Sequence, residues 1–461
     1  MAVELPGSFI NSLQPVAGFD EDSFVQAHHT GEQVVSVRFN AAKLQEPSQV
    51  SFLQKILGEP VPWSSRGYYL EERPLFTIDP QFHAGTYYVQ EASSMFLEQA
   101  LKQSCDLQQP IKVLDLCAAP GGKSTLLQSL ITADSLLVSN EVIKTRANIL
   151  TENISKWGAA NVVVTNNDPK DFWRLPGFFD CVVIDAPCSG SGMFRKDPAA
   201  IGEWSLNNVE LCSQRQQRII ADTWNALQPG GVLIYSTCSY SQEEDEGIAD
   251  WLMDQYEANN IRLQLKEEWG VVESVSAKHN CYGYRFYSGK IKGEGFFITV
   301  FRKQGTLQYN HSEGRMVKNS VLSKNETAIV YPWLKNPDHF KFIKWQDEVL
   351  AIPAAIYEDL LFLQQNLYIK KAGINMGAII RDELLPSHEL VLSAAYAHTL
   401  PELEADEKTA LDYLRRNDIR FETNTRGWAV VTFGGTALGL VKLLPNRVNN
   451  YYPRDWRILN K

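Results

Sequence analysis

The sequence predicts an α/β protein built around a doubly wound sheet of parallel strands. Between residues 111 and 256, apolar stretches typical of strands alternate with amphipathic stretches typical of helices. The apolar stretches lack the alternating polar residues of a half-exposed strand, which is typical of strands covered on both faces. A Pro-Gly-Gly turn at 120–122 joins the first of these strands to the first helix. Together these observations favour a parallel sheet with helices on both sides.

Each element of this region has its own signal in the sequence. Strands are expected where short apolar runs lie between turn residues, at 111–116, 135–141, 161–166, 178–186 and 231–237. Helices are expected at 123–131, 143–157, 203–227 and 241–256. A QPGG segment ends the third of these helices. The fourth is expected to begin with Ser241 as its N-cap, because acidic residues fill the first turn after it.

The 461 residues of the chain are enough for about three domains. We expect a small N-terminal α+β domain at 1–75 and the α/β core at 76–303. A polar and weakly patterned stretch predicts a linker at 304–327. Mixed helix and strand signals beyond it predict two small α+β modules, at 328–395 and 396–461.

Bulk composition narrows the class of protein. The net charge of −10, from 44 basic and 54 acidic residues, argues against a generic nucleic-acid binder but allows a local basic surface. No apolar run approaches the roughly 18 residues of a membrane span, and the first residues do not read as a signal peptide. The seven cysteines form no C-x-x-C pair and match no zinc spacing. We therefore expect a cytoplasmic protein with reduced thiols and no metal site.

The segment GGKST resembles part of a phosphate-binding loop. That motif requires a glycine five residues before Gly122, and Cys117 stands there instead, so the match fails. The glycine turn can still follow a ligand with its backbone. Glu141, about 20 residues on, lies where an acid typically holds a ribose hydroxyl, and Asp168 follows the third strand, where an adenine amino group would lie. The pattern predicts an adenosine-ligand site, with a purely structural turn and a solvated Glu141 as the alternative.

Two cysteines follow apolar strands in similar polar settings. Cys188 lies in DAPCSGSG, three residues after Asp185, and Cys238 lies in STCSY. Because the carboxyl ends of parallel strands meet in one crevice, these side chains are expected to converge near the adenosine ligand. Either cysteine alone would more often be a packing residue, but two beside a carboxylate favour chemistry. A metal site would need a third soft or imidazole ligand, and neither motif contains histidine.

Two thiols, a carboxylate and an adenosine ligand suit methylation of cytosine at C5. C5 is a poor nucleophile, but a thiolate that adds to C6 turns C5 into an enamine carbon able to attack a methyl sulfonium. A carboxyl group at N3 and the exocyclic amine offsets the charge that develops. A base must then remove the C5 proton before the thiol is expelled.

These motifs resemble those of the Sun/Nop family of S-adenosylmethionine-dependent RNA cytosine-C5 methyltransferases. The resemblance spans roughly residues 35–303 and implies a Rossmann-like class I methyltransferase core. It rests on five segments: AGTYYVQEASSMF (84–96), DLCAAPGGKS (115–124), DAPCSGSGMFRKDP (185–198), YSTCSYSQEEDE (235–246) and GEGFFITVFRK (293–303).

Both ends of the chain carry further resemblances. The segments VSVRFN (35–40) and VPWSSRGYYL (61–70) resemble the family's small leading domain, which implies RNA binding by 1–75. The C-terminal segment at 438–458 resembles the tail of bacterial RsmF-type enzymes, which act on small-subunit (16S) ribosomal RNA. The glycine-punctuated strands of GWAVVTFGGTALGLVKLL predict a PUA-like RNA-binding module within 396–461.

The resemblance implies a role for each site residue. Cys238 would be the nucleophile, Cys188 would assist release of the methylated base, and Asp185 would sit between cofactor and base. The cofactor S-adenosylmethionine would be bound by Cys117, Ala118, Ala119, Pro120, Gly121, Gly122, Lys123, Glu141, Arg146, Asp168 and Asp185. Arg146 and Lys196 are expected accessory contacts, with solvated surface residues as the alternative. The other cysteines are assigned to packing, namely Cys105, Cys181, Cys212 and Cys281.

The sequence departs from the family in one place. Tyr287 or Lys290 stands where a histidine is expected before the glycine pair of the last strand, which affects contacts and not the chemistry. Aromatic residues near both ends suit stacking on RNA bases, with a place in the domain cores as the alternative. They are Trp63, Tyr68, Tyr69, Tyr451, Tyr452 and Trp456, the last three beside Arg447, Arg454 and Arg457.

The target base must be unpaired or flipped out, because a base inside a stem cannot reach a crevice at strand ends. The expected partner is small-subunit rRNA, free or in a 30S particle. We expect the protein to be a monomer and not to bind a membrane. Three alternatives remain: a methyltransferase acting on tRNA or another RNA, a DNA cytosine or protein methyltransferase, and a catalytically silent ribosome-assembly factor. Cys238 argues against the DNA enzyme, which needs no cysteine there.

Overall fold

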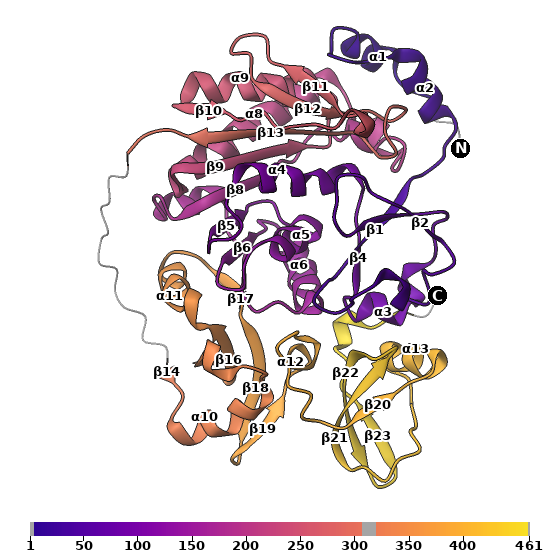
Figure 1. Cartoon of the computed structure of the whole chain (residues 1–461), viewed down its shortest axis with the longest axis vertical. Coiled ribbons are helices and arrows are strands. Elements are labelled where there is room, and N and C mark those ends of the chain that lie inside the picture. Colours follow the sequence, from indigo (N-terminus) through magenta and orange to yellow (C-terminus); the bar gives the residue numbers. More distant parts are fainter. Residues whose placement is uncertain (1–3, 307–319, 460–461) are drawn as a thin grey trace.

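The computed structural model describes residues 4–306 and 320–459 of the chain. Figure 1 shows a large sheet with helices on both faces, an N-terminal segment along one side, and two further modules drawn in orange and yellow. Within the described ranges, none of the helices combines the length and the apolar character that a membrane crossing requires.

The helices are α1 (Gly7–Leu13), α2 (Glu21–His29), α3 (Pro80–His83), α4 (Leu97–Ser104), α5 (Gly122–Leu130), α6 (Lys144–Trp157), α7 (Ala200–Glu203), α8 (Leu206–Thr223), α9 (Glu246–Gln255), α10 (Lys324–Val330), α11 (Tyr357–Asn366), α12 (His388–Leu392) and α13 (Glu407–Arg415). The longest helices are α6, with 14 residues, and α8, with 18, and the others have ten residues or fewer. Helices α6, α8 and α9 lie where the sequence predicts helices, as does α5.

The central sheet has ten strands, and it carries the site. They are β5 (Lys112–Asp115), β6 (Leu136–Asn140), β7 (Val162–Thr165), β8 (Phe179–Asp185), β9 (Leu227–Thr237), β10 (Ala258–Asn260), β11 (Val272–Val275), β12 (Tyr282–Phe286), β13 (Phe296–Lys303) and β17 (Ile369–Ala372). Their order is β11-β12-β13-β9-β8-β5-β6-β7-β17, with β10 beside β13. The five predicted strands are all present, as β5 to β9.

The sheet is mixed, so the expectation of a parallel sheet holds only for its centre. Strands β9, β8, β5, β6 and β7 pair in parallel. Strand β13 pairs antiparallel with β9, with Val300 opposite Ile234, and β12 and β11 continue antiparallel. These last strands follow one another without a crossover helix, and antiparallel pairing is the arrangement that short connections allow.

Helices on both faces explain why the central strands are continuously apolar. Successive residues of one strand, such as Val113 and Leu114, belong to two different hydrophobic cores. One core includes residues of α4, α5 and α6, and the other includes residues of α8, α9 and α11. Each strand side chain is therefore buried whichever way it points, which removes any reason for polar alternation.

The predicted helix start at Ser241 is wrong. The α-helix begins at Glu246, and residues 242–244 form a 3-10 turn before it. The Ser241 hydroxyl has no hydrogen-bond partner among the described residues. The reason is that Glu244 and Asp245 are fully buried and point beneath the cysteine motifs instead of extending the helix. The predicted helix at 203–227 is likewise divided, because Ser205 caps α8 at its N-terminus.

The N-terminal region packs against the core through a small sheet. Its strands, in the order β2-β3-β1-β4, are β1 (Val35–Phe39), β2 (Leu57–Pro60), β3 (Gly67–Leu70) and β4 (Tyr87–Val89). Helices α1 and α2 lie apart from this sheet, near β11 and β12 (Figure 1). There Phe9 and Phe24 pack with Tyr240 and Tyr287 of the core.

The C-terminal region forms two further sheets. The first contains β14 (Ser320–Val321), β15 (Phe340–Trp345), β16 (Glu348–Pro353), β18 (Ile374–Ile380) and β19 (Glu383–Pro386), and the second contains β20 (Glu402–Glu404), β21 (Gly427–Phe433), β22 (Thr436–Leu444) and β23 (Arg447–Asn450). Of the expected linker, residues 307–319 lie outside the described residues. The segment 320–327 holds β14 and the start of α10, where Ser323 and Glu326 form a capping box.

The region at 328–395 also contributes to the central sheet. Strand β17 pairs antiparallel with β7, with Ala372 opposite Val163. Tyr368, just before it, exchanges hydrogen bonds with Asn167, whose loop leads to Asp168. The core sheet is therefore completed by a strand from beyond residue 303.

Replacing Arg285 by alanine should lower the melting temperature of the protein markedly. Arg285 is 1% exposed, and it pairs with Asp245 at 3.1 Å and with both carboxylate oxygens of Glu246. Its loss leaves two buried carboxylates without a cation, which costs about 3–5 kcal/mol. Thermal denaturation measures the effect. Arg262 is the control, because its bidentate pair with Glu273 lies at the surface and its loss should leave the melting temperature nearly unchanged. Equal shifts for the two variants would contradict this account.

Candidate active site

The glycine turn between β5 and α5 borders a pocket of about 140 Å³. Gly121 has a φ of +120°, which favours glycine there, and Ala118 N donates a hydrogen bond to Asn140 O at 2.8 Å. The pocket is lined by Tyr88, Val89, Gln90, Glu91, Ser94, Cys117, Ala118, Ala119, Pro120, Gly122, Lys123 and Asp185. A larger hollow of about 680 Å³ is lined by residues 262–265 and Glu273, and none of the predicted site residues lines it.

Glu141 and Arg146 are tied to this turn. Glu141 is buried, its carboxylate accepts a hydrogen bond from Ile143 N at 2.8 Å, and Arg146 Nη1 lies 3.5 Å away from it. Arg146 Nη2 donates to Ala119 O at 2.7 Å. Arg146 therefore connects the acid at the end of β6 to the backbone of the turn.

Asp168 lies apart from the pocket lining. Its carboxylate accepts a hydrogen bond from Lys170 N at 3.1 Å and caps the 3-10 turn at Pro169–Arg174. The loop that carries it is held at Asn167 by Tyr368, so its position depends on the segment before β17.

The N-terminal sheet supplies a contact that the sequence reasoning missed. Arg38 of β1 is 1% exposed and donates through Nη2 to Gly122 O at 3.2 Å and to Thr125 Oγ1 at 2.6 Å. Burial lowers the pKa of Arg38 to about 9, so it remains a cation at neutral pH. No local motif marks this arginine, because its partners lie more than 80 residues away in the sequence.

Lys123 and Asp185 form an ion pair at the inner end of the pocket. Lys123 Nζ lies 2.7 Å from Asp185 Oδ2, and Ser236 Oγ donates to Asp185 Oδ1 at 2.9 Å. Burial alone would lower the pKa of Lys123, but the carboxylate of Asp185 outweighs it and the pKa is raised. The charge on Lys123 is therefore maintained at neutral pH.

The two motif cysteines lie in contact at the ends of β8 and β9. Cys188 Sγ and Cys238 Sγ are 3.1 Å apart, and both side chains are half-buried. The hydrogen bond with Cys238, and then burial, raise the pKa of Cys188 well above its usual range. The raised pKa favours the protonated form of Cys188, while by geometry either sulfur can donate the hydrogen bond between them.

A close backbone approach keeps the two cysteine loops together. Gly192 N donates to Cys238 O at 2.8 Å, and Gly295 N donates to Gly192 O at 3.1 Å. A Cβ at Gly192 would lie 2.5 Å from Gly295 O and 2.8 Å from Cys238 O. Only glycine fits at this position, which explains the second glycine of the Gly190–Gly192 segment.

Many of the remaining candidates belong to the protein core. Cys181, Cys212 and Cys281 are buried and Cys105 is half-buried, as packing residues would be. Trp63, Tyr69 and Tyr452 are buried as well, which favours the core alternative for these aromatics. Tyr287 is buried and stacks on Tyr240, whereas Lys290 is exposed and Lys196 is half-buried.

Three family models match the chain in succession. The N-terminal domain of 16S rRNA methyltransferase RsmF matches residues 5–92, 16S rRNA methyltransferase RsmB/F matches 103–302, and the methyltransferase RsmF PUA domain matches 400–458. Ribosomal RNA small subunit methyltransferase F of Aliivibrio fischeri is 30% identical over 98% of this chain and 97% of its own length. The chain belongs to the RsmF family of 16S rRNA methyltransferases. The same-named protein of Shewanella oneidensis is also 30% identical, over 98% of this chain and 97% of its own.

Solved structures agree with this RsmF-family fold. A methyltransferase homologue from Pyrococcus horikoshii has a TM-score of 0.51 and 26% identity, covering 65% of this chain and 100% of its own. NSun6 from the same organism, solved with SFG, has a TM-score of 0.54 and 20% identity, covering 65% and 99%. The family membership, the Rossmann-like core and the PUA domain expected from the sequence are confirmed.

Side chains that could hold a metal ion were sought in the described residues. Across residues 4–306 and 320–459, no three or more His, Cys, Asp or Glu side chains are grouped so as to hold a metal ion.

Proposed function

We propose that this protein transfers a methyl group from S-adenosylmethionine to C5 of a cytosine in 16S rRNA, through a covalent bond between Cys238 and C6. The observation that carries the proposal is the thiol pair, with Cys188 Sγ and Cys238 Sγ 3.1 Å apart at two neighbouring strand ends. Asp185 and its partner Lys123 line the adjoining pocket. A methyltransferase that acts on oxygen or on an exocyclic nitrogen needs no such thiol pair.

The residues around the pocket suit S-adenosylmethionine. It follows the glycine turn on one side, and the acid Glu141 stands at the end of the next strand, as in nucleoside sites. Asp115 Oδ1 is buried without a hydrogen-bond partner among the described residues, and burial raises the pKa of this carboxyl to about 7. The turn residues 117–123 would hold the cofactor, which supplies an electrophilic methyl group, with Glu141 and Arg146 beside the turn. Asp168 lies apart from the pocket lining and would contact the adenine end of the cofactor. The NSun6 structure with SFG supports this choice.

The reaction divides between the two sulfurs. Cys238, as the thiolate, adds to C6 of the cytosine and makes C5 nucleophilic. The negative charge that the thiolate brings onto the ring is offset when N3 takes up a proton relayed by the Asp185 carboxyl group, which also accepts a hydrogen bond from the exocyclic amine. After methylation the C5 proton leaves to a base and the bond from C6 to Cys238 breaks. Cys188, which lies within hydrogen-bond distance of Cys238, assists this release.

The asymmetry of the thiol pair supports Cys238 as the nucleophile. Cys188 holds its proton, because the hydrogen bond with Cys238 and burial raise its pKa. A DNA cytosine enzyme, in which the proline-linked cysteine attacks, would need the opposite arrangement.

The modules at 1–75 and 396–461 are proposed to hold the RNA. In the second, Trp428 packs edge-on against Tyr451, which is 43% exposed, and Lys442 Nζ lies 5.2 Å from the Trp428 ring. Exposed aromatic and basic groups of this kind suit unpaired bases and phosphates. Tests of this role should use point variants, because a deletion from residue 330 onward would also remove β17 from the central sheet.

Transfer of a labelled methyl group from S-adenosylmethionine tests the function directly. The purified protein should label 16S rRNA, offered either free or in 30S particles, and digestion should release the label as 5-methylcytidine. Bisulfite sequencing of rRNA from a deletion strain should show the loss of one or more protected cytosines, restored by the wild-type gene. Label found only on tRNA would contradict the rRNA substrate. Failure both to bind the cofactor and to transfer label would favour the silent assembly factor.

A further inference from the structure

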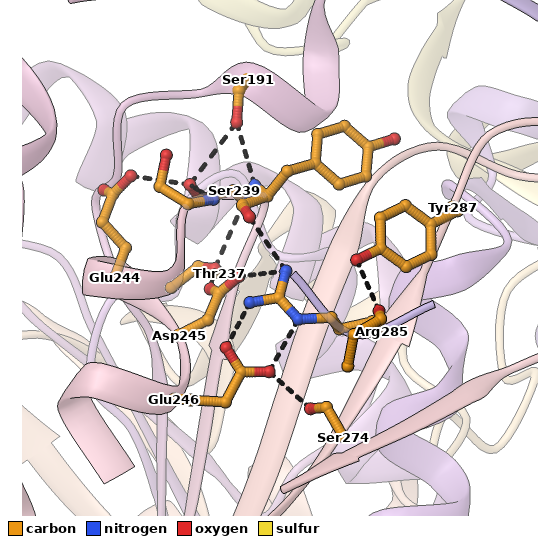
Figure 2. A network of polar contacts seen from close by, with 12 residues as sticks. Ser191, Thr237, Ser239, Glu244, Asp245, Glu246, Ser274, Arg285 and Tyr287 are labelled. Atoms are coloured by element: carbon orange, nitrogen blue, oxygen red, sulfur yellow. Dashed lines mark hydrogen bonds and ion pairs between the residues drawn. The ribbon is translucent and has the colours of Figure 1, made fainter. Parts of the chain in front are cut away.

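Glu244 lies directly beneath the two cysteine loops. Its side chain is fully buried, although it stands among acidic residues in the 3-10 turn before α9. Figure 2 shows its carboxylate pointing toward Ser239. Burying a carboxylate is costly unless several donors satisfy it. The position of Glu244 therefore calls for a reason.

The donors that satisfy Glu244 come from both cysteine loops. Ser189 N donates to Oε1 at 2.8 Å, and the hydroxyls of Ser189 and Ser239 donate to Oε2 at 2.5 and 2.6 Å. Ser189 directly follows Cys188, and Ser239 directly follows Cys238. Gln216 of α8 completes the set by donating from Nε2 to Oε1 at 3.1 Å. One carboxylate thus binds the residue after each sulfur.

We propose that Glu244 is the positioning residue that sets the distance between the two thiols. This inference rests on the proposed function, since it assigns the pair to one reaction. Release of the methylated base requires Cys188 to reach the sulfur or the base at the moment the bond to Cys238 breaks. A bridge that fixes the residue after each cysteine keeps the pair in contact while RNA enters and leaves.

Hydrogen bonds and an ion pair around Glu244 hold the neighbouring segments in place. Thr237 donates to Asp245 at 2.7 Å, and Arg285 both pairs with Asp245 and donates to Tyr240 O at 2.9 Å. Figure 2 shows this network continuing from Ser191 to Ser274. Residues on both sides of Cys238 are therefore anchored to the turn that carries Glu244. On the Cys188 side, the Ser189 backbone is anchored by Glu244 itself.

The two carboxylate oxygens of Glu244 have different hydrogen-bond partners, so two substitutions should have different effects. Oε1 faces Ser189 N and Gln216 Nε2, which can only donate, whereas Oε2 faces two hydroxyls, which can rotate to accept. Glu244→Gln can place its oxygen toward the obligate donors and its amide nitrogen toward the hydroxyls. It should therefore retain the bridge. Glu244→Leu has similar size but no acceptor, and it should release both loops.

The direct test is a reagent that reports the thiol distance without catalysis. Phenylarsine oxide reacts with two neighbouring thiols, so that two arsenic–sulfur bonds form and one water leaves. The measurement uses the full chain with Cys105→Ser, because Cys105 and Cys181 form a second thiol contact. The protein should bind one equivalent, and either Cys188→Ala or Cys238→Ala should abolish this binding. Glu244→Leu should weaken the affinity about tenfold or more, as loss of charge-assisted hydrogen bonds would.

Glu98 provides a matched control for general destabilisation. It is 1% exposed, and it also accepts hydrogen bonds from a serine hydroxyl and a serine backbone amide, those of Ser64 and Ser65. Glu98→Leu should lower the melting temperature but leave arsenical affinity and kcat within about threefold of the parent. Glu244→Leu should lower kcat about tenfold or more with an unchanged dissociation constant for the cofactor. Glu244→Gln should retain most of the arsenical affinity and most of kcat.

The outcomes separate the inference from the proposed function. Glu244 does not set the thiol distance if Glu244→Leu binds the arsenical as tightly as the parent. The same holds if Glu98→Leu loses as much arsenical affinity as Glu244→Leu. If Glu244→Leu does not fold, the pair Ser189→Ala and Ser239→Ala removes the hydroxyl bonds and should weaken arsenical binding in the same direction; unchanged binding in that variant would overturn the inference. If arsenical binding behaves as expected while no RNA is methylated, the positioning role stands and the proposed function fails.

Discussion

Replacing Cys238 with alanine should abolish methyl transfer while cofactor binding persists. The substitution removes the sulfur that adds to C6, so C5 of the base never becomes nucleophilic. Loss of a covalent nucleophile costs on the order of 10⁴-fold or more in kcat. The cofactor pocket is lined by the glycine turn and Asp185 and not by Cys238. Labelled methyl transfer and titration with S-adenosylmethionine measure the two properties on the same preparation.

Cys212→Ala is the matched control for this variant. Cys212 is 4% exposed and lies within α8, where its Sγ is 3.9 Å from Asn208 Oδ1. Removing its sulfur should lower stability slightly and leave the rate of transfer nearly unchanged. Residual activity of Cys238→Ala within tenfold of the wild type would contradict a covalent role for this residue.

Replacing Cys188 with alanine should trap the protein on its RNA. Attack by Cys238 and methylation do not need the second sulfur, but release does. The adduct should therefore accumulate as a slowly migrating band on a denaturing gel, with turnover reduced by about 10²-fold or more, as for loss of a general acid–base group. Nuclease digestion should return the band to the mobility of the free protein.

The double variant identifies the trapped sulfur. Cys188→Ala combined with Cys238→Ala should give no adduct, because no sulfur remains at the strand ends. If Cys238→Ala alone gave the slow band and Cys188→Ala did not, the two roles would be reversed.

The centre of the fold is predictable because burial on both faces leaves a strong local signal. Strands such as Leu136–Asn140 are buried along their whole length, and the loops between them contain glycine and proline. The antiparallel edge is not visible in this way, since β13 is as apolar as its parallel neighbours. Ser241 fails as a helix cap for a physical reason that lies far away in sequence. Glu244 and Asp245 find partners in the core, and those bonds outweigh the local preference of a serine for an N-cap.

The candidate site shows the same division between local and distant information. The turn at 117–123, Glu141 and the two cysteines are marked by their position after strands. Sequence reasoning could not place Arg38, Asn167 or Glu244, because each acts on a segment that only the folded chain brings near. A buried carboxylate inside an acidic run has no signature of its own. The ion pair of Lys123 with Asp185 likewise depends on the side-by-side pairing of β5 and β8.

Strand β17 has a consequence for how the protein is made. The edge it covers, β7, consists of three valines and a threonine, a sequence that readily pairs with other strands. The covering strand is synthesised about 200 residues later, which at about 5–20 residues per second is a delay of about 10–40 s. During that interval the nascent chain on the ribosome carries an open sheet edge. We expect nascent chains on closely spaced ribosomes to aggregate through β7. Slower elongation between β7 and β17 should increase this aggregation.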